Sequence, residues 1–114
     1  MDNTRKKELQ SQYTQREVIG GVYIVKNTRN NKILLDSSTD INGSKNRFEF
    51  AQKTGSCVNP KLQKDWAVYG HDQFVLEVLD ELKKGETQTQ EEFRTDISLL
   101  KEIWHEKLSN EDLY

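Results

Sequence analysis

The segment GGVYIVKNTRNNKILLDSS (residues 20–38) holds two short apolar runs on either side of the polar turn NTRNN. This arrangement is typical of a β-hairpin with a five-residue connection. The apolar runs, at 22–25 and 33–35, do not alternate with polar residues, and a strand without alternation is usually covered on both faces. We therefore expect strands at 22–26 and 32–36, with helices above and below the sheet.

The rest of the chain predicts helices around a third strand. The last helix has the clearest amphipathic pattern, because apolar residues recur every three or four positions along 90–107. The order of elements favours an α+β fold, with a small three-stranded antiparallel sheet flanked by helices and an extra N-terminal helix. We expect residues 1–19 to form a helical extension and residues 20–114 to form one domain. The other expected elements are helices at 4–17, 45–54 and 60–69 and a strand at 73–79.

Charge is distributed unevenly along the chain, although the net charge of −2 is small. Residues 22–66 carry eight basic and four acidic side chains, whereas residues 67–114 carry five basic and twelve acidic ones. The middle segment could therefore present a weakly basic face to phosphates. An ordinary solvated surface of mixed charge is the alternative explanation of the same balance.

Composition excludes several classes of protein. Cys57 is the one cysteine, so the chain forms no internal disulfide and no Cys-rich zinc site. No apolar run approaches the length needed to cross a membrane, and the first residues lack the apolar stretch of a secretory signal. We therefore expect a cytoplasmic protein that has no membrane partner.

Two separated blocks of sequence carry a resemblance to a known family. The blocks are GVYIVKNTRNNKI (21–33) and NPKLQKDWAVYGHDQFVLEVLDEL (59–82). In this order and at this separation they resemble the GIY-YIG nuclease domain, particularly that of phage-type homing endonucleases and of small stand-alone bacterial relatives. The resemblance implies the GIY-YIG fold and an endonuclease-like site that acts on DNA. In that family a divalent metal assists the attack of water on a phosphodiester.

The resemblance also implies which residues stand at the catalytic positions. Tyr23 matches the tyrosine of the first signature tripeptide. Leu34 stands at the second tyrosine and Asp36 at the glycine of the second tripeptide. Ser44 stands at the family's arginine and Phe48 where a histidine is common. Since leucine transfers no proton and an aspartate repels phosphate, the active site is predicted to be degenerate.

Two further residues are candidates for the missing parts. Arg47 lies about one helical turn after Ser44, so it is a catalytic candidate beside Tyr23, with a solvated surface arginine as the alternative. Glu92 is the candidate metal ligand, with Asp96 one turn further along. The alternative for Glu92 is an exposed acid that favours the positive end of the helix dipole. For Tyr23 the alternative is a tyrosine of the core.

These replacements predict a GIY-YIG-like protein whose nuclease activity is lost or severely impaired, because several catalytic contacts are missing together. Such a protein would keep a binding role toward nucleic acid or a protein partner. Nucleic acid would be held through its phosphates, and the candidate contacts are Arg29, Lys32, Lys45 and Lys53. One alternative is an active endonuclease with a rearranged site, which would use Mg²⁺ or Mn²⁺. Another is a dimerisation module that uses the N-terminal helix.

Overall fold

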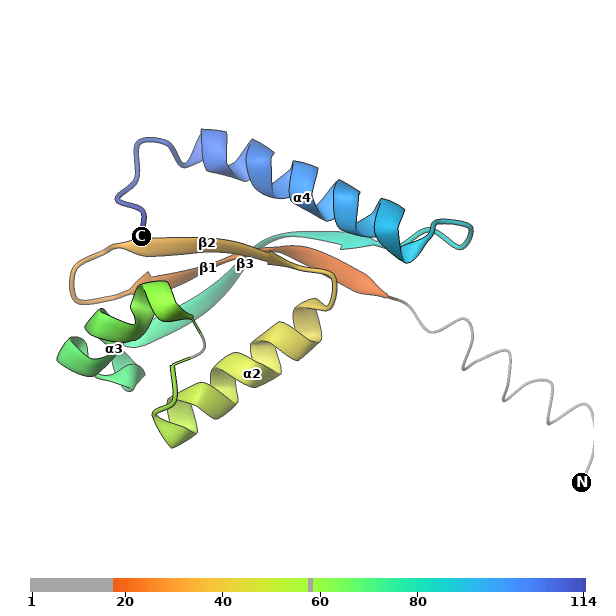
Figure 1. Ribbon diagram of the computed structural model, residues 1–114. Helices are drawn as coiled ribbons and strands as arrows, with labels where there is room; N and C mark the ends of the chain where they lie inside the picture. Colours follow the sequence, from red (N-terminus) through yellow and green to blue (C-terminus); the bar gives the residue numbers. More distant parts are fainter. Residues whose placement is uncertain (1–17, 58) are drawn as a thin grey trace, which may run out of the picture.

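The computed structural model describes residues 18–57 and 59–114, so the helix expected at 4–17 lies outside the described residues. Three strands form one antiparallel sheet in the order β2-β1-β3. In Figure 1, α4 covers one face of this sheet, whereas α2 and α3 lie on the other. The predicted α+β fold is therefore confirmed. The elements are β1 (Ile19–Asn27), β2 (Ile33–Ser38), α2 (Ile41–Thr54), η1 (Pro60–Leu62), α3 (Gln63–Tyr69), η2 (His71–Gln73), β3 (Phe74–Lys83) and α4 (Gln90–Lys107).

The predicted bounds are right for α4 and for the segment 60–69, whereas they are too short for β1, α2 and β3, and β2 lies at 33–38 rather than at 32–36. Strand β1 begins at Ile19, which pairs with Lys83, so both β1 and β3 extend beyond the apolar runs. Helix α2 begins at Ile41, earlier than expected, because the Asp40 side chain accepts a hydrogen bond from the Gly43 N–H and caps the helix. The helix ends at Gly55, whose left-handed backbone (φ 77°) suits glycine.

Two apolar clusters, one on each face of the sheet, form the core. On the α4 face, Val22 and Ile24 of β1 pack with residues of β2 and α4. On the α2 and α3 face, Val25 packs with Leu34 and with Trp66 of α3. Successive β1 side chains point to opposite faces, so the absence of alternation follows from burial on both sides. The hairpin therefore lies between two helical layers, as its sequence predicts.

The end of the chain is fixed to the sheet beside β2. Leu113 forms a parallel bridge with Ile33, and the Tyr114 N–H donates to the Ile33 carbonyl oxygen at 2.9 Å. The Tyr114 hydroxyl donates to Asp65 Oδ2 at 2.6 Å and accepts from Asn27 Nδ2 at 3.1 Å. These contacts tie the β1–β2 turn to α3. In the part of the chain that the structure describes, no helix combines the length and apolar character needed to cross a bilayer.

Candidate functional site

A cavity of about 240 Å³ lies between the β1–β2 hairpin and α2. Tyr23 of β1 and Arg47 of α2 both line it, so the structure brings the two predicted catalytic residues together. The cavity also holds the four positions at which the resemblance implies different residues, Leu34, Asp36, Ser44 and Phe48. The cavity therefore gathers Tyr23, Arg47 and these four positions in one place.

The hairpin register places Tyr23 directly opposite Asp36. The Tyr23 hydroxyl donates a hydrogen bond to Asp36 Oδ2 at 3.2 Å. Burial, followed by the charge of Asp36 and this hydrogen bond, raises the pKa of Tyr23 to about 12, although Ser44 and Arg47 act in the opposite direction. Tyr23 is therefore a neutral phenol at physiological pH, which makes it a poor proton acceptor.

Helix α2 supplies the other wall of the cavity. Ser44 lies in its first turn and is buried, whereas Arg47 is exposed one turn further along. The Arg47 Nη2 donates to Ser44 Oγ at 3.0 Å, which holds the guanidinium beside the cavity. A guanidinium in this position can bind a phosphate through two parallel hydrogen bonds. The helix therefore places a phosphate-binding group beside Tyr23.

A cation from α4 also reaches the site, because Lys101 Nζ lies 3.9 Å from Asp36 Oδ1. Strand β2 is at the edge of the sheet, so a side chain from the α4 face can approach Asp36 around that edge. Lys101 is not among the residues predicted from the sequence. The one feature of the sequence that could have pointed to Lys101 is its position on the helical wheel, 80° from Phe93 and therefore beside the apolar stripe. Asp36 therefore has a tyrosine on one side and an ammonium group on the other.

Glu92, the predicted metal ligand, lies in the N-terminal cap of α4. Its Oε1 accepts from the Thr89 backbone N–H at 3.4 Å, while Thr89 Oγ1 accepts from the Glu92 N–H at 3.1 Å. This reciprocal pair is a capping box. Glu92 is nine positions before Lys101, or roughly 14 Å along the helix axis. Asp96, its neighbour, accepts from Gln88 at 2.6 Å. The structure therefore does not bring Glu92 together with Tyr23 and Arg47.

The carboxylates at the cavity do not fit the divalent metal that the resemblance implies. Mg²⁺ and Mn²⁺ prefer several oxygen ligands. Among the described residues that line the cavity, Asp36 carries the one carboxylate, and it already contacts Tyr23 and Lys101. Within 18–57 and 59–114, no three His, Cys, Asp or Glu side chains are grouped so that they could hold a metal ion.

The four predicted phosphate contacts come from two different places. Arg29 and Lys32 belong to the β1–β2 turn, where Lys32 Nζ lies 5.5 Å from the centre of the Tyr114 ring. Lys45 and Lys53 belong to α2, with Lys53 in its last turn. Only the α2 pair shares an element with Arg47. None of the four is among the described residues that line the cavity, where Arg47 is the one basic side chain.

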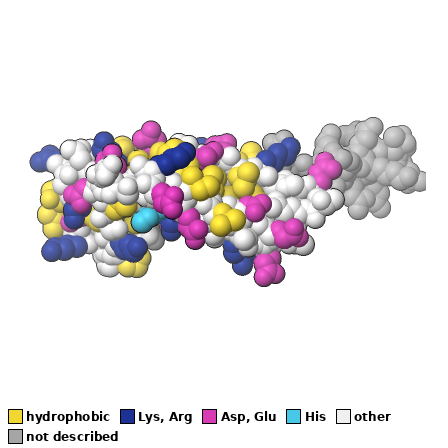
Figure 2. Space-filling view, turned by 90° about the horizontal axis from the view of Figure 1, so that it is seen from above, with side chains coloured by type: hydrophobic (Ala, Val, Ile, Leu, Met, Phe, Trp, Pro, Cys, Tyr) yellow, Lys and Arg dark blue, Asp and Glu magenta, His cyan; other side chains and the backbone are white. Residues whose placement is uncertain are grey.

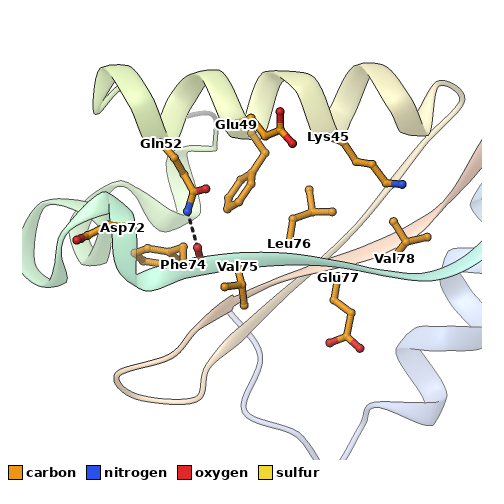
Figure 3. A pocket seen from close by; sticks show the side chains of 10 residues that line it. Lys45, Glu49, Gln52, Asp72, Phe74, Val75, Leu76, Glu77 and Val78 are labelled. Atoms are coloured by element: carbon orange, nitrogen blue, oxygen red, sulfur yellow. Dashed lines mark hydrogen bonds between the residues drawn. The ribbon is translucent and has the colours of Figure 1, made fainter.

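A larger hollow of about 730 Å³ lies between α2 and the edge strand β3 (Figure 3). Apolar side chains of β3 form its floor, and Gln52 Nε2 donates to the Phe74 carbonyl oxygen at 2.5 Å. Three acids and one base line this hollow: Glu49, Asp72, Glu77 and Lys45. This excess of negative charge disfavours phosphate, so the smaller cavity is the better candidate for an anion.

The α4 face of the molecule is mixed in charge. Figure 2 views the molecule from this side and shows acidic, basic and hydrophobic side chains interspersed. Helix α4 itself carries five acidic and three basic residues. A phosphate backbone would meet both signs of charge on this face. The α2 side, with Arg47 and the cavity, is therefore the more suitable surface for nucleic acid.

Comparison with known proteins supports the fold. The chain is similar to the solved catalytic domain of the homing endonuclease I-TevI, with a TM-score of 0.58 and 24% identity over 82% of this chain and 96% of that one. A glutamate-to-alanine variant of the catalytic domain of the intron endonuclease I-TevI gives the same TM-score and identity, over 80% and 84% of the two chains. No protein-family model and no curated protein matches the chain. The chain therefore has the fold of a GIY-YIG catalytic domain, as its sequence predicts.

Proposed function

We propose that this chain binds nucleic acid through its phosphates and that its phosphodiester cleavage is lost or severely impaired. The observation that carries the proposal is the chain of contacts from Tyr23 through Asp36 to Lys101. These contacts engage the carboxylate of the cavity and place two cations, Lys101 and Arg47, around it. Such an arrangement favours the binding of an anion more than the activation of water.

Cleavage would need proton transfer and stabilisation of new negative charge. Water at neutral pH needs a base or a metal to activate it. Tyr23 is present, but its pKa is raised to about 12, so it keeps its proton at neutral pH. Leu34 has no group that accepts a proton. A missing contact such as the one at Leu34 typically lowers a rate by about 10²–10⁴-fold. These losses support a binding role over a catalytic one.

The alternative is an active metal-dependent endonuclease with a rearranged site. Its support is the position of Arg47, which lines the cavity beside Tyr23. In this alternative Asp36 would have to leave Lys101 before it could bind Mg²⁺ or Mn²⁺. A binding role toward a protein partner, a cytoplasmic location and a bacterial or phage origin stay predictions.

Incubation of the purified chain with supercoiled plasmid and either Mg²⁺ or Mn²⁺ separates the two functions. We expect no nicking, together with binding that weakens steeply as salt increases, because phosphate contacts release counterions. Nicking that disappears in both Tyr23→Phe and Arg47→Ala would establish the alternative. Binding that stays constant from low to moderate salt would refute a phosphate-driven role. Val68→Ala, at an exposed position of α3, is the matched control.

A further inference from the structure

A second, apolar hollow adjoins the cavity on the outer surface of α2. Its volume is about 330 Å³, and the surface that faces the hollow is almost entirely apolar. Phe50 lies at this hollow with 66% of its surface exposed, beside Ala51 and Cys57. A phenyl ring that is two-thirds exposed contributes little to the core. The ring is therefore available to a ligand.

Arg47 lines both this hollow and the cavity that contains Tyr23. It stands three positions before Phe50, and residues at this spacing are neighbours on a helix surface, with Cβ atoms about 5–6 Å apart. A ligand that places an anion against the guanidinium can therefore reach the phenyl ring with its next group. The two hollows share Arg47, so a charged group and an aromatic ring lie next to each other on this side of α2.

The charge of α2 suits a polyanion on this surface. The helix carries Lys45, Arg47 and Lys53 against one acid, Glu49. Glu49 and Lys45 both line the larger hollow on the β3 side, so Arg47 is the one charged residue, among the described residues, that lines the hollow at Phe50. A strand that alternates phosphates with flat bases matches a guanidinium beside an exposed ring.

We propose that Phe50 is a stacking platform for an unpaired base, so that the chain prefers single-stranded nucleic acid. The inference rests on the proposed function, because Arg47 is taken to hold the adjoining phosphate. Bases in a duplex are stacked on their neighbours, whereas unpaired bases turn outward and stack on aromatic side chains. Asn46 lines the same hollow, and its amide can donate to or accept from the edge of a stacked base.

The test compares a short oligothymidylate with an abasic strand of the same length. Alanine substitution of a stacking residue typically costs about 1–3 kcal/mol per base, equivalent to an affinity loss of about 5- to 150-fold. We expect Phe50→Ala and Phe50→Leu to weaken oligothymidylate binding within this range and to leave abasic binding unchanged. Phe50→Trp should preserve binding, and the fluorescence of the added indole should be quenched by the bases.

The controls separate this inference from the proposed function. Val68→Ala removes another apolar side chain, 67% exposed, and should change neither affinity. Equal wild-type affinity for the two strands would overturn base stacking while leaving phosphate binding intact. Failure of both strands to bind would overturn the proposed function itself. An equal effect of Phe50→Leu on duplex and single-stranded DNA would refute the preference for single strands. Thermal unfolding of each variant verifies that the fold is retained.

Discussion

Replacement of Asp36 by asparagine should strengthen the binding of short single-stranded DNA and increase its sensitivity to salt. The pair between Asp36 and Lys101 spans 3.9 Å, and the two side chains are 35% and 40% exposed. An ion pair this exposed contributes only about 0–1 kcal/mol, so the protein should stay folded without it. Once released, Lys101 can neutralise one more phosphate. For a single strand, one additional contact steepens the slope of log K against log salt by about 0.7.

Fluorescence anisotropy of a labelled oligothymidylate over a series of salt concentrations measures this slope. Lys101→Gln is the matched variant, because it removes the cation and leaves the carboxylate. The double variant Asp36→Asn/Lys101→Gln should show no steepening relative to Lys101→Gln alone. An unchanged slope in Asp36→Asn would refute the reasoning. Steepening of the same size in the double variant, which lacks Lys101, would also refute it. The pKa of Tyr23 should also fall below 12 in Asp36→Asn but stay above 10.0, because burial is the larger cause of its shift.

Two further predictions concern stability. Burial and Asp36 raise the pKa of Tyr23 from 10.0 to about 12, so the unfolded chain ionises first and the protein should lose stability between pH 10 and 12. Solvent screens the partly exposed phenol, so we expect a loss of about 1–2 kcal/mol from this residue. Denaturant titrations of Tyr23→Phe should lack this part of the loss, whereas the part due to Tyr114, whose pKa is also raised, should remain. Gly20→Ala should lower the free energy of unfolding by about 1–3 kcal/mol, because the new Cβ would lie 2.6 Å from the Ser38 carbonyl oxygen. The control is Gly85→Ala, whose Cβ meets only ordinary van der Waals contacts and should leave stability nearly unchanged. Urea denaturation measures both variants.

Side-chain pattern was sufficient to predict the layers of this fold. The runs at 22–25 and 33–35 lack alternation because they supply apolar side chains to two clusters, one under α4 and one under α2 and α3. The ends of the strands were less predictable. Strand β3 continues to Lys83 through polar residues because Ile19 and Gly20 pair with its end. Backbone pairing between distant segments leaves little trace in the local sequence, so the strand predicted at 73–79 ended where the run of apolar residues ended.

The candidate site was predicted in part, and the helical wheel explains the limit. Tyr23 and Arg47 were identified and lie at the same cavity. On α4, however, Glu92 and Lys101 lie on opposite margins of the apolar stripe, at about −100° and +80° from Phe93. Which margin faces the β2 edge depends on the sheet order and the direction in which α4 crosses it. The periodicity of one helix gives neither the sheet order nor the direction of α4. The contact between Lys101 and Asp36 could therefore not be predicted from the sequence.

The floor of the cavity shows why this fold persists with altered chemistry. Leu34 and Phe48, which stand where the resemblance implies polar residues, line the cavity and also belong to the core cluster, at 4% and 5% exposed. Full burial of such a side chain contributes about 1.5–3 kcal/mol, whereas a buried hydroxyl without a partner costs stability. An apolar floor thus stabilises the domain and removes proton transfer from the same positions. Arg47 and Asp36 line the same cavity, and Lys101 lies beside Asp36. This apolar floor next to a guanidinium is the physical reason for our proposal that a phosphate binds here without being cleaved.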